Sequence, residues 1–91
     1  SKETARRREA NLPLRDKIEK QEKQQQKLQI RLTDIEQLLA DEQLYSPEQK
    51  AALLKLMNEQ TELKGQLALS ENQTLELMME LEELETSFGE M

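Results

Sequence analysis

The stretch "LYSPEQKAALL", residues 44–54, marks the start of a helix in the middle of the chain. Ser46 is of a residue type that caps helix N-termini, and Pro47 suits the first helical position, where its missing N–H needs no partner. Gln49, three residues after Ser46, completes a capping box. The pattern predicts a helix that begins at Pro47, so an earlier helix must end a few residues before it.

The residues before this restart carry a long seven-residue pattern. Apolar residues and two glutamines recur at alternating steps of four and three, which is a heptad seam. Because Pro13 favours a helix start and biases Leu12 away from helical angles, we expect this helix to begin near Pro13. Its seam positions are Leu14, Ile18, Gln21, Gln25, Leu28, Leu32, Ile35 and Leu39.

The residues after the restart carry a second seam of the same kind. Its positions are Leu53, Leu56, Gln60, Leu63, Leu67, Ser70, Thr74, Leu77, Leu81, Leu84 and Phe88. Two helices joined by a loop of a few residues meet only antiparallel. The sequence predicts an all-α fold, an antiparallel two-helix coiled-coil hairpin over residues 13–91, with helices over about 13–42 and 47–87 and a turn over about 43–46.

The first twelve residues, "SKETARRREANL", are mostly polar and contain three consecutive arginines. They fit either a basic linker or a helical lead-in to Pro13. The chain begins with Ser1 rather than Met, and we expect it to be a fragment of a longer protein.

The composition excludes most catalytic chemistry. Hydrophobic residues make up 35% of 91 residues, with only two aromatics, which suits helices sharing a thin seam better than a globular core. There is no cysteine and no histidine, which excludes disulfides, thiolate chemistry and imidazole ligands. No glycine-rich phosphate loop is present. We therefore expect no catalytic, cofactor-binding or metal-binding residue in this chain.

Two features near the end of the chain could suggest a binding site. The glutamates of "MELEELE" (Glu80, Glu82, Glu83 and Glu85) radiate around one helix, which favours a solvated face over a cation site. Met78 and Met79 fit either a soft binding patch or filler on the helix flank, and we favour filler.

The charge is divided unevenly along the chain. Residues 1–31 hold ten Lys/Arg and five Asp/Glu, a net charge of +5, whereas residues 32–91 hold three and fourteen, a net charge of −11. Clustered cations can bind phosphates without reading bases. The candidate contact residues for nucleic acid or the ribosome are Arg6, Arg7, Arg8, Arg15, Lys20, Lys23, Lys27 and Arg31. Asp16, Glu19 and the lack of stacking aromatics favour the alternative of a solvated, salt-bridged coiled coil.

Two seam registers are compatible with the pattern. In an antiparallel pair of helices the numbers of two facing residues add up to a constant. This constant is 88 in one register and 95 in the other. A sum of 88 places Gln21 against Leu67 and predicts the ion pairs Arg15–Glu71, Glu22–Lys64, Arg31–Glu59 and Glu36–Lys50. A sum of 95 places Gln25 against Ser70 and Gln21 against Thr74, but the loop must then climb about 9 Å. The shorter loop favours 88.

The segment "ARRREANLPLRDKIEKQEKQ" and the turn "LLADEQLY" followed by "QKAALL" resemble the C-terminal coiled-coil domain of ABC-F proteins, in the YheS-like branch. The resemblance spans nearly the whole chain. It implies a cytosolic parent with two tandem ATPase domains that bind ATP and Mg²⁺, associated with the ribosome and translation. In some members this domain is linked to DNA or RNA binding. No ATPase motif lies in this chain, so no catalytic residue is carried over.

The residues and the resemblance together predict an accessory domain. It would position its parent on the ribosome or on nucleic acid, through the basic side of the first helix. The alternative is a structural coiled coil that docks on its own ATPase domains or on a partner protein. We expect a monomeric hairpin in the cytoplasm, with no membrane partner.

Overall fold

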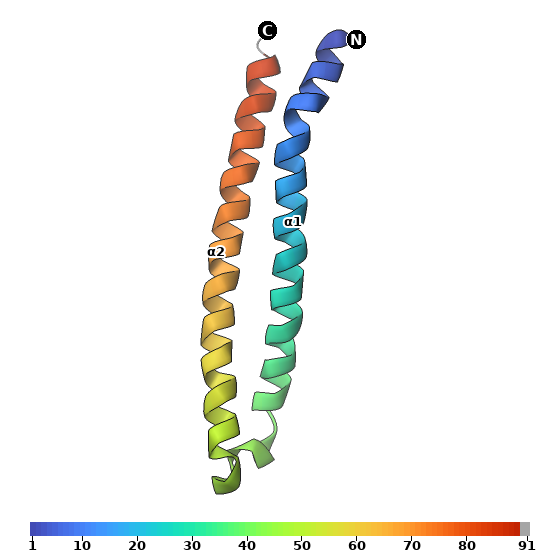
Figure 1. The fold of residues 1–91 in the computed structure, drawn as a ribbon. Coiled ribbons are helices and arrows are strands. Elements are labelled where there is room, and N and C mark those ends of the chain that lie inside the picture. Colours follow the sequence, from blue (N-terminus) through green and yellow to red (C-terminus); the bar gives the residue numbers. More distant parts are fainter. Residues whose placement is uncertain (90–91) are drawn as a thin grey trace.

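A computed structural model describes residues 1–89 of the chain, and the side chains of residues 1–87. Two long helices, α1 (Lys2–Leu39) and α2 (Lys50–Gly89), are joined by two short 3₁₀ turns, η1 (Glu42–Tyr45) and η2 (Pro47–Gln49). The helices run antiparallel side by side, and their free ends lie together (Figure 1). The rod measures 68 × 16 × 15 Å, with a radius of gyration of 20.3 Å, against about 12 Å for a globular chain of this length. The predicted all-α hairpin is confirmed.

Helix α1 begins eleven residues earlier than expected, at Lys2. Ser1 is its N-cap, and its Oγ accepts a hydrogen bond of 3.2 Å from the Thr4 N–H. The prediction of a start near Pro13 is wrong, and the helical alternative for residues 1–12 is the one observed. Pro13 lies inside the helix, where it removes one backbone hydrogen bond. The blue end of α1 leans away from α2 in Figure 1, as expected for a proline bend.

The turn is longer and more ordered than the sequence predicts. Helix α1 ends at Leu39, three residues before the expected end, and α2 is preceded by η2. Asp41 Oδ1 accepts from the Gln43 N–H at 3.0 Å, and the Tyr45 hydroxyl donates to the Leu39 carbonyl at 2.7 Å. Pro47 restarts the helical path as expected, but the Ser46 side chain makes no capping hydrogen bond. The restart is therefore confirmed, and the capping box is not formed.

A hydrogen-bonded polar layer occupies the middle of the seam. Gln25 Nε2 donates to Thr74 Oγ1 at 2.6 Å and to the Ser70 carbonyl at 3.2 Å. Ser70 Oγ donates to Gln21 Oε1 at 2.7 Å, and Thr74 Oγ1 donates to the Ser70 carbonyl at 2.9 Å. Ser70 and Thr74 are both buried. Each buried hydroxyl therefore has a partner, and the layer is satisfied as a unit.

These contacts show that the register has a sum of 95, so the preference for 88 is wrong. Gln25 lies against Ser70 and Thr74, as the alternative register requires. A buried polar group without a partner costs about 1–3 kcal/mol, whereas an exposed ion pair contributes a few tenths. The longer connection is built by η1 and η2, which pack against the part of α2 that reaches past the end of α1 (Figure 1).

The apolar core is thin and lies mainly on α1. Ile18, Leu32 and Ile35 are buried, and Ile35 has no exposed surface. The leucines of α2 at seam positions are half-buried. At the open end, the sum of 95 places Leu77 opposite Ile18, Leu81 opposite Leu14, and Leu84 opposite Asn11, which is buried. The added helix before Pro13 thus covers Leu84, which a helix starting at Pro13 would expose. Leu12 and Ala5 are exposed and take no part in this cover.

A disulfide test can separate the two registers, because the chain has no cysteine of its own. In the observed register Leu28 faces Leu67, so the double variant Leu28→Cys/Leu67→Cys should form an intramolecular disulfide on mild oxidation. The variant Leu28→Cys/Gln60→Cys, which fits the sum of 88, should not, since a seven-residue offset moves the sulfurs about 10 Å apart. Faster oxidation of the second variant, measured by gel mobility, would contradict the register described here.

Stability should depend strongly on Ile35, because it is the most deeply buried side chain of the seam. Ile35→Ala should lower the free energy of unfolding by about 2–4 kcal/mol, from lost burial and the cavity left behind. Ile30 is 58% exposed on the same helix, and Ile30→Ala should change stability by less than about 0.5 kcal/mol. Urea denaturation followed by circular dichroism measures both. Equal effects would mean that the seam is packed differently.

Candidate nucleic-acid interface

Three lysines form a compact cationic surface on the outward side of α1. Lys20, Lys23 and Lys27 are exposed and follow each other at steps of three and four, which places them on one face of the helix. The set spans about 10 Å along the helix axis. We call Lys20, Lys23 and Lys27 the lysine triad.

Lys23 is the one member of the triad in an ion pair with a described residue. Its Nζ lies 3.0 Å from Glu19 Oε1, one helical turn earlier. Both side chains are more than 60% exposed, and such a pair contributes only a few tenths of a kcal/mol. Lys23 can therefore exchange this partner for a phosphate at little cost.

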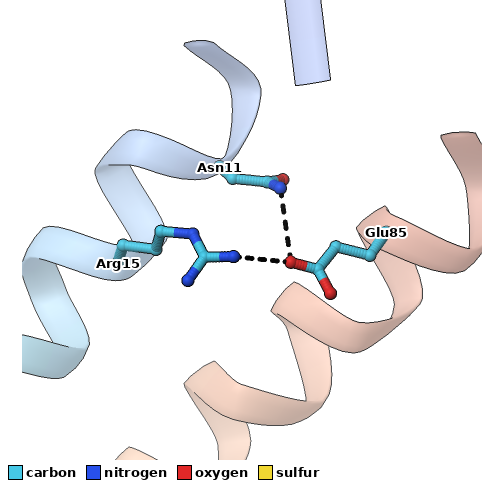
Figure 2. A network of polar contacts seen from close by, with 3 residues as sticks. All are labelled: Asn11, Arg15 and Glu85. Atoms are coloured by element: carbon cyan, nitrogen blue, oxygen red, sulfur yellow. Dashed lines mark hydrogen bonds and ion pairs between the residues drawn. The ribbon is translucent and has the colours of Figure 1, made fainter. Parts of the chain in front are cut away.

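Two of the predicted contact residues are engaged in ion pairs between the helices. Arg15 Nη2 lies 2.8 Å from Glu85 Oε1, and Asn11 Nδ2 donates to the same oxygen at 3.5 Å (Figure 2). Arg31 binds Glu59 with two parallel hydrogen bonds, from Nε at 2.9 Å and Nη2 at 2.8 Å. The expected Arg31–Glu59 pair is thus present, whereas Arg15 pairs with Glu85 and not with Glu71. Both arginines hold α1 to α2.

The three consecutive arginines do not extend the lysine triad as one surface. Arg6, Arg7 and Arg8 are exposed on the first turns of α1, and successive helical residues point about 100° apart. Arg6 shares the direction of Lys20, fourteen residues later, but the exposed carboxylates of Glu9 and Asp16 lie along the helix between them. The basic side of α1 is therefore two separate clusters.

Lys17 is a cation that the sequence reasoning left out. Together with Lys20, the member of the triad nearest to α2, it lines a shallow groove between the helices, whose other wall carries Gln73, Glu76 and Glu80. The charges around this groove largely compensate each other. The location of this groove follows from the register, because Lys17 flanks the seam next to Ile18. The correct register would therefore have predicted the position of Lys17 in the groove.

The described residues bring together no group of histidine, cysteine, aspartate or glutamate suited to a metal ion. The glutamates near the end of α2 point around the helix, and Glu85 is taken up by Arg15. Tyr45 is half-exposed in the loop, far along the rod from the triad, and the side chain of Phe88 lies outside the described residues. The arrangement can bind anions through lysines but offers no stacking platform beside them.

Comparisons with protein-family models, with curated proteins and with solved structures find no match to this chain. The resemblance to the ABC-F family therefore rests on the residues quoted above. Among the described residues, neither helix has an apolar stretch sufficient to cross a membrane.

The Arg31–Glu59 pair should make stability depend on pH. The hydrogen bond from Arg31 lowers the pKa of Glu59, and it raises the pKa of Arg31. A carboxyl group with a lowered folded-state pKa stabilises the fold above its unfolded pKa of about 4.3 and loses this contribution as the pH falls through the folded value.

Urea unfolding of the wild type and of Glu59→Gln should therefore differ at pH 7, and the difference should shrink when the pH is lowered from 7 to below about 4.3. Glu62→Gln, which removes an exposed carboxylate outside the ion pairs of the described residues, is the matched control and should show no such convergence. A difference between wild type and Glu59→Gln that is equal at both pH values would show that the pair does not hold the helices together.

Proposed function

We propose that this chain is a non-catalytic accessory domain of an ABC-F type ATPase, which places its parent on the ribosome or on nucleic acid. The parent's own domains would bind ATP and Mg²⁺ and hydrolyse the nucleotide in the cytoplasm. The observation that supports the proposal is the lysine triad, three exposed cations within about 10 Å on the outward side of a rod.

The chemistry of the triad suits the phosphate backbone. Lysine ammonium groups neutralise phosphates without reading base sequence, and this term dominates non-specific nucleic-acid binding. The net charge of α1 is positive, with ten Lys/Arg against seven Asp/Glu, and that of α2 is negative, with three against eight, so phosphate would approach from the α1 side. An elongated domain with one cationic side would allow contact with phosphates at a distance from the ATPase domains of its parent.

A protein-interaction module is the second candidate. It is favoured by the apolar residues that α2 exposes, among them Leu54, Leu75 and Met79, each more than 50% accessible. Such a module would bind through α2 and would not depend on the lysine triad.

The triad proposal predicts a steep salt dependence that the triple variant Lys20→Gln/Lys23→Gln/Lys27→Gln should flatten. Loss of three phosphate contacts should lower the slope of log K against log salt by between about two and three, for a duplex. Fluorescence anisotropy with mixed-sequence duplex RNA and DNA over a salt series measures this slope, and circular dichroism confirms the helix content.

Replacing the same three lysines by arginine keeps the charge and should keep the affinity. Binding that survives the glutamine variant unchanged, or absence of binding by the wild type at low salt, would refute the proposal and favour the protein-interaction module.

A further inference from the structure

The side of α2 that faces away from α1 carries a second seam. Its positions follow the same three-four spacing as the inner seam, displaced around the helix, and every one of them is exposed. We define this outer face by Leu54, Asn58, Thr61, Gly65, Ala68, Asn72, Leu75 and Met79. Between residues 51 and 79, no charged residue occurs at a position of this outer face. Hairpin packing uses only the opposite side of α2, so the hairpin does not explain this pattern.

The large apolar side chains lie towards the two ends of the outer face, and small ones lie at its centre. Leu54, Met57, Leu75, Met78 and Met79 are each between 43% and 57% exposed. Gly65 is central and helical, and a Cβ built there would meet no atom within 4 Å. A glycine in mid-helix weakens the helix, and nothing in the hairpin requires it. A second helix crossing closely at this point would require it.

We propose that the outer face binds the same face of a second copy, forming an antiparallel four-helix dimer with two-fold symmetry. The charges flanking the face select the occupant and the register. When facing residue numbers sum to 133, Leu54 meets Met79, and Gly65 meets Ala68 beside the symmetry axis. Thr61 then faces Asn72, and their side chains can hydrogen-bond across the interface.

In this register two lysines of α2 meet glutamates of the other copy. Lys64 flanks Glu71 and Lys55 flanks Glu76, each twice by symmetry. Lys64 and Glu71 have no oppositely charged residue three or four positions away on their own helix, and neither is in an ion pair of the described residues. Glu48 opposite Glu83, at the ends of the contact, is the one unfavourable charged pair.

The neighbouring registers are poorer. A sum of 126 places Lys64 against Lys64 and Glu62 against Glu62, which repel. A sum of 119 leaves Leu75, Met78 and Met79 uncovered, and a sum of 140 places Glu71 against Glu71. A parallel dimer, in which flanking residues five apart pair between the copies, places Lys50 beside Lys55 and Glu71 beside Glu76. The expectation of a monomeric hairpin was based on the inner seam alone. The dimer proposed here uses the outer face and leaves the inner seam unchanged.

Charge reversal with rescue tests this interface by sedimentation equilibrium of the 91-residue chain. The wild type should be a dimer at micromolar concentration. Lys64→Glu and Glu71→Lys should each weaken self-association by about ten-fold or more, because each creates two like-charge pairs. An equimolar mixture of the two variants should recover the wild-type affinity as a heterodimer, since both flanking pairs are then attractive. Lys27→Glu, the same charge change on the outward side of α1, should leave association unchanged.

The variant Gly65→Leu gives an independent test, because it should raise the stability of the monomer and weaken its self-association. In the monomer the leucine meets open space and removes a helix-weakening glycine, so thermal stability at low concentration should rise. In the dimer it forces the helices apart, so association should fall. A monomeric wild type up to high micromolar concentration would overturn the proposal, as would a dimer insensitive to both sites or a mixture that fails to recover. The lysine triad lies on α1, so its nucleic-acid test is independent of these outcomes.

Discussion

The hydrogen bonds between the glutamines of α1 and the hydroxyls of α2 determine the position of the other contacts in the hairpin. Sliding the helices by seven residues would move Ser70 against Ile18 and Thr74 against Leu14, and would leave the Ser70 hydroxyl without its partner Gln21. Because one heptad is the smallest shift that keeps the seam apolar, no gradual adjustment is available. The polar layer thus determines the loop length, the flanking ion pairs and the residues that cover the open end.

The seam pattern and the Pro47 restart were sufficient to predict the hairpin from the sequence. The register was not predicted correctly, because it depends on a comparison of two small energies. A short loop was weighed against a polar match, and η1 and η2 provide the extra path with hydrogen bonds from Asp41 and Tyr45. The predicted start of α1 near Pro13 was wrong for a related reason. An isolated rule for proline favours a helix start, but packing of Ala10 and Asn11 near α2 outweighs one lost hydrogen bond.

The candidate site was predicted in part, and the difference again comes from the register. Lys20, Lys23 and Lys27 were recognisable from helical spacing alone, because their outward position does not depend on how α2 is aligned. Arg15 and Arg31 could not be separated from them by composition, since an arginine beside the seam is free or paired according to which glutamate the other helix supplies. Glu59 and Glu85 supply those partners, so these two cations belong to the fold.

The polar layer also gives the rod a mechanical division. The beginning of α1 and the end of α2 lie at the same end of the hairpin (Figure 1), so a pull on these two points separates the helices progressively from that end. The stretch nearer the ends contains Asn11, whose buried Oδ1 has no hydrogen-bond partner among the described residues, and it holds Ile18 alone as a buried apolar side chain. The stretch beyond the layer holds Leu32 and Ile35. The layer therefore separates a weakly packed outer stretch, which such a pull would open first, from the better packed stretch beside the loop.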